Sequence, residues 1–147
     1  MHFVVAGRGS ALPELRKLVT RLGLERCVTL ATDFAAYEDV LAAIDVVVQS
    51  SQVDVSGLSI LEAMGHGRPV IAFNTGTACE IVEDGKTGLL VPKGNVTALA
   101  EAMERLVGSP DAARRMGEQA RLTVKRKFNV RIVGRETLLY YAAILNA

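Results

Sequence analysis

The apolar residues of this chain gather in five short runs, separated by longer stretches of mixed character. The runs occupy residues 2–6, 27–31, 46–48, 68–73 and 89–91. Each run is mainly apolar, and polar positions do not alternate along it, which is typical of parallel strands buried on both faces. The intervening stretches carry apolar residues at helical spacing. The pattern predicts an α/β fold: an open parallel sheet of about five strands with helices on both faces and further helices at the C-terminus.

Capping residues predict several helix boundaries. Pro13 opens a helix that ends near Leu22, and a second helix covers about residues 36–43. After the last strand, three more helices are expected over residues 95–107, 110–127 and 129–147. Thr77 and Glu80 have the spacing of a capping box, which would give Glu80 a purely structural role.

A polar stretch before the fourth apolar run brings two acids to the start of a short apolar helix. Asp54 precedes this helix, Gly57 opens it and Glu62 lies inside it. The free N–H groups at a helix N-terminus attract anions. A carboxylate on so apolar a helix is expected to be buried and must then find a partner. That partner is either His66 or Arg68 within the chain, or a hydroxyl group of a ligand.

The loop Gly7-Arg8-Gly9 follows the first predicted strand. A Gly-x-Gly sequence serves either a tight turn or the close approach of a phosphate to the main chain, and the motif alone does not separate the two. In open parallel sheets, ligands bind beyond the carboxyl ends of the strands. This loop falls at such an end, as do Asp33, Asp54 and Gly76.

The composition favours one cytoplasmic domain. The chain has 147 residues, half of them apolar, which is enough for a buried core. Cys27 and Cys79 are isolated in the sequence, so we expect two buried, reduced thiols and no metal site. No apolar run approaches the roughly 20 residues of a membrane span, and the N-terminus does not resemble a signal peptide. We therefore expect a soluble protein with no transmembrane segment.

The net charge is only +1, but its distribution is uneven. Between Arg114 and Arg135, eight Lys or Arg residues accompany the single acid Glu118. Such a segment is either a solvated face or a surface for anionic lipid, nucleic acid or another domain. Because aromatic residues are scarce among these charges, we expect no nucleic acid partner, whereas peripheral membrane contact stays open.

Five sequence blocks occur in a specific order, at residues 3–9, 41–48, 57–64, 67–72 and 80–92. The most specific are Leu-Glu-Ala-Met at 61–64 and Glu-Ile-Val-Glu-Asp-Gly-Lys-Thr-Gly-Leu-Leu-Val-Pro at 80–92. In these blocks the chain resembles the C-terminal, donor-binding domain of the retaining GT-B glycosyltransferases of family 4, also called group 1. The resemblance covers nearly the whole chain.

The resemblance implies transfer of a sugar from a nucleoside diphosphate donor to an acceptor hydroxyl, with retention at the anomeric carbon and with no cofactor, metal or protein nucleophile. It places Glu62 on the ribose hydroxyls and makes Asp54, beside the donor sugar, the candidate catalytic residue. It assigns the sugar and diphosphate to main-chain amides at the start of the helix. The further candidates for donor binding are Ser56, Gly57, Leu58, Gly7, Arg8 and Gly9.

The chain also departs from the family pattern. Asp54 replaces the family's glutamate, Val55 replaces a glycine, and Ser56 replaces an aromatic residue. Thr77 occupies the position of a second glycine. Aspartate is shorter by about 1.5 Å, so we expect altered donor binding. From the resemblance we expect this chain to lack the first strand of the family's domain, which carries an Arg and a Lys, and the N-terminal acceptor domain. Arg8 is a candidate substitute for those cations.

Two interpretations follow from the resemblance. In the first, residues 1–147 are a single donor-binding domain that needs the acceptor domain for catalysis, so the isolated chain is inactive. In the second, the chain is a non-catalytic nucleotide-sugar-binding module, or it self-associates through the apolar face of its last helix, which includes Leu138 and Tyr141. The sequence does not identify the base, the sugar or the acceptor.

Overall fold

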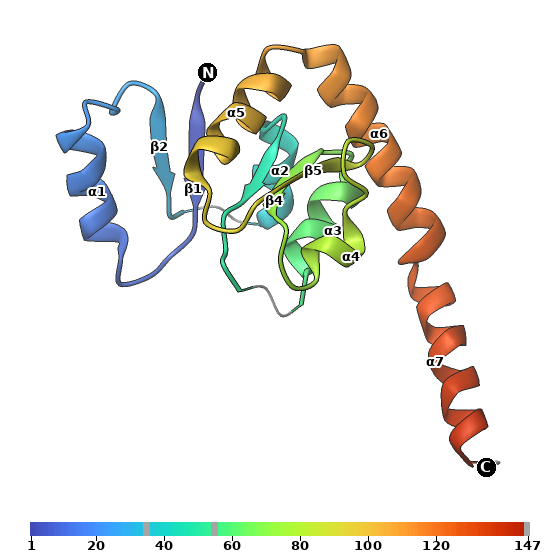
Figure 1. Cartoon of the computed structure of the whole chain (residues 1–147). Coiled ribbons are helices and arrows are strands. Elements are labelled where there is room, and N and C mark those ends of the chain that lie inside the picture. The colour runs from blue at the N-terminus through green and yellow to red at the C-terminus, as the bar shows by residue number, and fades with distance from the viewer. Residues whose placement is uncertain (34–35, 54–55, 146–147) are drawn as a thin grey trace. The chain divides into compact units, whose positions relative to one another are not determined.

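A computed structural model of the chain describes residues 1–33, 36–53 and 56–145 (Figure 1). The described residues form two units, Met1–Ile44 (unit 1) and Asp45–Ala147 (unit 2). Each unit contains parallel strands joined by helices, which confirms the predicted α/β class. The five strands form two sheets rather than the expected one, because the described strands pair only within each unit.

Unit 1 contains the two-stranded sheet. Strand β1 (Phe3–Ala6) pairs in parallel with β2 (Val28–Ala31), and α1 (Leu12–Arg21) connects them. Helix α2 (Tyr37–Ala43) follows β2. As predicted, a proline lies in the first turn of α1, where its missing N–H costs no hydrogen bond.

The core of unit 1 is small. Val4 and Val5 of β1 are 42% and 46% exposed, and α1 has no buried residue. Of the fully buried apolar side chains in the part of the chain that the structure describes, Leu41 alone belongs to unit 1. Parallel sheets are normally covered on both faces, whereas the apolar side chains of β1 are only partly buried within this unit.

Unit 2 contains the three-stranded sheet and most of the core. Strand β4 (Val70–Phe73) lies between β3 (Val47–Gln49) and β5 (Gly88–Val91), and both pairings are parallel. All four residues of β4 are buried. A central strand without polar positions is the arrangement that its continuous apolar sequence predicts.

The helices of unit 2 complete its core. They are α3 (Leu58–Gly65), the short α4 (Ala78–Ile81), α5 (Val96–Val107), α6 (Pro110–Lys127) and α7 (Val130–Leu145). The predicted cap of α5 is present, because the Ala98 N–H donates to Asn95 Oδ1 (3.0 Å). Side chains of α5 and α6 pack on β4 and β5 in one cluster: Ile71, Phe73, Leu89, Val91, Leu99, Ala102, Leu106, Ala113 and Met116.

Helices α3 and α6 approach each other through glycines. A Cβ atom added to Gly117 of α6 would collide with the main-chain oxygen of Gly67 and would lie 3.1 Å from Pro69 Cδ. Gly67 and Pro69 connect α3 to β4. The absence of a side chain at Gly117 therefore sets how closely α6 can pack against the end of α3.

The turn before β5 is held by polar side chains. Thr87 is fully buried, and its Oγ1 accepts a hydrogen bond from the Glu83 N–H (2.9 Å). The Leu90 N–H donates to Asp84 Oδ1 (2.9 Å). The Glu83 carboxylate contacts Lys86 Nζ (2.7 Å) and Lys127 Nζ at the end of α6 (2.9 Å). These bonds connect the turn to the C-terminal end of α6.

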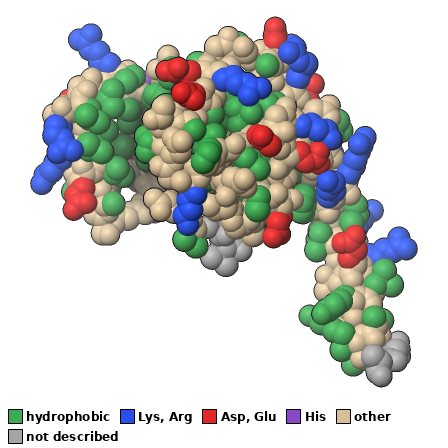
Figure 2. All heavy atoms as spheres, viewed as in Figure 1, with side chains coloured by type: hydrophobic (Ala, Val, Ile, Leu, Met, Phe, Trp, Pro, Cys, Tyr) green, Lys and Arg blue, Asp and Glu red, His purple; other side chains and the backbone are tan. Residues whose placement is uncertain are grey.

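Helix α7 has no buried residue. Its exposed apolar side chains include Leu138, Tyr141 and Leu145, which are 71%, 58% and 85% exposed. Figure 2 shows apolar side chains along this helix, with a few charged ones between them. Within the described ranges, the helices are all too short or too polar to span a membrane.

The two cysteines are free, and the prediction that both are buried is wrong. Cys27 is partly buried, whereas Cys79 is exposed on α4. The Cys79 thiol donates to the Gly76 carbonyl oxygen (2.9 Å), so it lies along the outside of the turn that begins α4.

We predict that Gly117→Ala destabilises the chain. The new methyl group would push against a main-chain carbonyl, and overpacking of this kind costs about 1–3 kcal/mol. Gly134→Ala in α7 is the matched control, because a Cβ there meets no atom within 4 Å and alanine favours a helix by up to about 1 kcal/mol. Urea unfolding of both variants checks this. A Gly117→Ala variant as stable as the wild type would contradict the proposed packing.

A second prediction concerns pH. Hydrogen bonds from Lys86 and then Lys127 lower the pKa of Glu83 from 4.5 to about 2. A carboxylate with a lowered pKa adds stability above its unfolded-state value, and this stability is lost as the pH falls from 4.5 toward 2. Glu83→Gln should therefore lower the melting temperature at neutral pH, with the difference shrinking across that window. Glu118→Gln, on the exposed face of α6, serves as the control.

Candidate functional site

The candidate site in unit 2 is built around the N-terminus of α3. The chain leaves β3 at Gln49, and Gly57 begins the helix with φ at 62°, in the left-handed region. Glycine adopts this conformation without the strain that a side chain would bring. Gly57 is buried, and a Cβ atom there would collide with Ile81 Cδ1 and lie 3.0 Å from Thr77 Oγ1. The start of α3 therefore rests directly against α4 and the turn before it.

The side chains of α3 divide into a buried and an exposed set. Ile60, Ala63 and Met64 are fully buried and fix the helix in the core of unit 2. Glu62 is exposed, as is Leu58 in the first helical position. The expectation that Glu62 is buried on this apolar helix is wrong, because the buried residues occupy one side of α3 and Glu62 lies on the other.

The Glu62 carboxylate makes no hydrogen bond or ion pair with any of the residues that the structure describes. The predicted intramolecular partner His66 instead donates from Nδ1 to the main-chain oxygen of Glu62 (2.9 Å). Nearby, Gln49 Nε2 donates to Ser59 Oγ (3.2 Å), so the end of β3 and the first turn of α3 are connected by side chains. The carboxylate is left available to a ligand at the surface.

The main-chain donors at this helix start are only partly described. The Leu58 N–H reaches Ser56 Oγ at 3.4 Å, a long hydrogen bond. Asp54, the candidate catalytic residue, and Val55 lie outside the described residues. Ser56, Gly57 and Leu58 lie at the N-terminus of α3, as the sequence predicts, where the positive end of the helix dipole favours an anion.

Thr77 is the N-cap residue of α4, as the sequence predicts, but its side chain makes no capping hydrogen bond. Its φ and ψ of −70° and −18° are helical, whereas a capping side chain needs an extended residue. The Glu80 N–H accordingly donates to the Thr77 carbonyl oxygen (3.1 Å), and the predicted capping box is wrong. Thr77 Oγ1 is buried and has no hydrogen-bond partner among the described residues.

The remaining candidates, Gly7, Arg8 and Gly9, lie in unit 1, directly after β1. Arg8 Nε donates to the Thr32 carbonyl oxygen (2.7 Å), and its guanidinium group lies 3.7 Å from the Asp33 carboxylate. Both side chains are largely exposed. These contacts hold Arg8 beside the carboxyl end of β2, as expected for neighbouring parallel strands.

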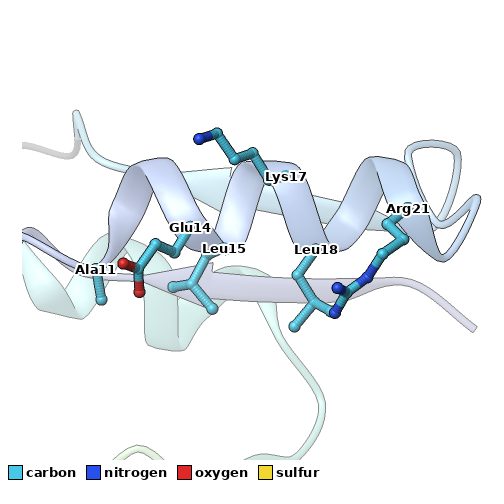
Figure 3. A pocket seen from close by; sticks show the side chains of 6 residues that line it. All are labelled: Ala11, Glu14, Leu15, Lys17, Leu18 and Arg21. Atoms are coloured by element: carbon cyan, nitrogen blue, oxygen red, sulfur yellow. The ribbon is translucent and has the colours of Figure 1, made fainter.

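A hollow in unit 1 lies along α1 and contains none of the predicted site residues (Figure 3). All of its lining side chains come from α1 and its N-cap residue: Ala11, Glu14, Leu15, Lys17, Leu18 and Arg21. Leu15 and Leu18 are each 37% exposed, so the hollow is part of the surface of one helix. In the described part of the chain, no three His, Cys, Asp or Glu side chains come together as a metal site would need.

Comparison with known proteins identifies the family. The family profile described as "Glycosyl transferases group 1" matches residues 1–123. The chain belongs to the group 1 glycosyl transferases. It is 34% identical over 146 residues to alpha-D-kanosaminyltransferase of Streptomyces kanamyceticus, covering 97% of this chain and 38% of that enzyme. The GT-B resemblance noted in the sequence is thereby confirmed.

Several solved structures have the same fold. Anabaena Alr3699/HepE in complex with UDP superposes with a TM-score of 0.89 at 26% identity, over 97% of this chain and 41% of that one. TarM superposes with a TM-score of 0.87 at 30% identity, over 95% of this chain and 28% of that one. The C-terminal domain of LpcC from Francisella tularensis gives 0.73 at 25% identity, over 81% and 63%. The chain thus spans well under half the length of its full-length relatives.

The packing at Gly57 leads to a prediction for this glycosyl transferase chain. Gly57→Ala should destabilise it more than Gly85→Ala, by about 1–3 kcal/mol. Both glycines have left-handed φ, at 62° and 74°, so both variants pay the same backbone strain. Only at Gly57 does the methyl group also collide with a neighbour, since a Cβ at Gly85 meets nothing within 4 Å. Equal melting temperatures for the two variants would rule out the close contact.

Proposed function

We propose that this chain is the donor-binding domain of a retaining glycosyltransferase, which binds a nucleoside diphosphate-sugar at the N-terminus of α3. The observation that supports this best is the exposed Glu62 carboxylate, which has no partner among the described residues and lies little more than one turn from the helix start. In this proposal Glu62 accepts hydrogen bonds from the two ribose hydroxyls. Ionised carboxylates accept such bonds strongly and can serve two donors at once.

The diphosphate would lie at the start of α3. The dipole of the helix favours an anion there. Gly57 has no side chain, and this lets the start of α3 pack directly against α4. The proposed contacts to sugar and diphosphate are the amides of Ser56, Gly57 and Leu58. The complexes of Anabaena Alr3699/HepE with UDP and with UDP-glucose support a nucleotide-sugar as the ligand class.

The chemical step is proposed by family analogy. Asp54 would contact the donor sugar, and Gly7, Arg8 and Gly9 would serve the donor's anionic part, with Arg8 as the only cation of that loop. Sugar transfer to an acceptor hydroxyl would occur with retention, without metal or cofactor. Because the relatives are far longer than this chain, we propose that transfer also requires an acceptor-binding domain and that residues 1–147 alone bind without turnover.

The binding test compares ribose and 2′-deoxyribose ligands. UDP, GDP and ADP are titrated into the labelled chain at up to millimolar concentration and followed by NMR. For the nucleotide that shifts the amides of residues 57–62, Glu62→Gln should weaken binding about tenfold or more, because a hydrogen bond to a charged group is lost. The 2′-deoxy form should bind more weakly than the ribose form to the wild type, and this difference should shrink in Glu62→Gln.

Glu101→Gln is the matched control, since Glu101 is an exposed helical glutamate on α5, and it should bind as the wild type does. If none of the three nucleotides shifts residues 57–62, the binding proposal is wrong. A sedimentation mass of twice the chain in that case would favour the second candidate, a non-catalytic module that self-associates. The exposed apolar side chains of α7 are the observation that favours this candidate.

A further inference from the structure

Ser59 carries a hydroxyl group that is used as an acceptor but not as a donor. Its Oγ accepts a hydrogen bond from Gln49 Nε2 (3.2 Å), and the bond is partly buried. To the residues that the structure describes, the Ser59 hydroxyl donates no hydrogen bond. A serine hydroxyl can accept and donate at the same time. Because Ser59 keeps some solvent exposure, its O–H is available to water or to a ligand.

Ser59 lies beside Glu62 on the accessible side of α3. Three residues turn an α-helix by about 300° and advance it by about 4.5 Å, so the two side chains are neighbours on one face. Ile60 and Ala63, by contrast, are fully buried in the core. Gln49 is the last residue of β3 and reaches Ser59 from the carboxyl end of that strand, where ligands of open parallel sheets bind. The hydroxyl is therefore next to the carboxylate to which the proposed function assigns the ribose.

We propose that Ser59 is a further donor-binding residue, whose hydroxyl donates a hydrogen bond to a ribose oxygen of the bound nucleotide, and that Gln49 is the positioning residue for this hydroxyl. The inference rests on the proposed function. A ribose hydroxyl that donates its proton to the Glu62 carboxylate becomes a better acceptor, because successive hydrogen bonds polarise one another. Gln49 occupies one lone pair of Ser59 Oγ and so limits the directions in which the O–H can point. The ribose is then held by an acceptor and a donor from the same helix.

Removal of the hydroxyl should weaken nucleotide binding and leave the free chain folded. Ser59→Ala should lower the affinity for UDP about two- to tenfold, the range for one neutral hydrogen bond, and alanine favours the helix. Ser59→Thr keeps the hydroxyl and should retain the wild-type affinity. Gln49→Met has a similar length without the amide, so it should cause a smaller loss, and no further loss when combined with Ser59→Ala. The loss of affinity on removing a ribose hydroxyl, at the 2′ or the 3′ position, should be smaller in Ser59→Ala than in the wild type.

The experiment titrates UDP, 2′-deoxy-UDP and 3′-deoxy-UDP into the full chain, these variants and Glu62→Gln, with thermal unfolding of each in the absence of ligand. Gln119→Met, on the exposed face of α6, is the matched control for Gln49→Met and should bind as the wild type does.

The inference is overturned if Ser59→Ala binds UDP like the wild type, if Ser59→Thr binds as weakly as Ser59→Ala, or if both deoxy forms lose as much affinity in Ser59→Ala as in the wild type. When wild type and Glu62→Gln differ as expected, these outcomes leave the proposed function standing. If the wild type does not bind UDP, the proposed site fails for this nucleotide, and the Ser59 inference fails with it.

Discussion

The position of α3 depends on two places where main chain meets its neighbours without a side chain between them. At its start, Gly57 rests against Ile81 and Thr77, and behind its end the main chain at Gly67 meets Gly117 of α6. Close-packed interiors transmit any change in volume, so a methyl group at either place would displace the helix. The close packing also fixes the position of the candidate site, because its N–H groups and Glu62 belong to the same short helix.

Burial of one side of α3 also explains why Glu62 is available. Ile60, Ala63 and Met64 hold the helix in the core, so the opposite side has to face solvent. A carboxylate there is stabilised by water and needs no partner in the chain, which removes the intramolecular pairing that the sequence left open. A ligand can replace that water at little cost, whereas a buried ion pair would first have to be broken.

The sequence predicted what depends on local pattern. The apolar runs became strands, Asn95 and Pro110 began helices, and Gly57 opened α3 as expected. It failed where the outcome depends on neighbours that are distant in sequence. The Thr77 to Glu80 spacing matches a capping box. In the structure, Thr77 packs against Gly57 and has a helical backbone conformation, in which its side chain does not cap α4. The Glu83 to Lys127 ion pair joins residues far apart in the chain and had no signal in the spacing.

The candidate residues of the two units lie in segments of different local stability. Glu62 and Gly57 rest on a core to which β4, α5 and α6 all contribute, whereas Gly7, Arg8 and Gly9 follow a strand whose valines are nearly half exposed. Local stability follows the apolar contacts that must be broken to open a segment. The loop after β1 should therefore open at a lower free energy than the start of α3.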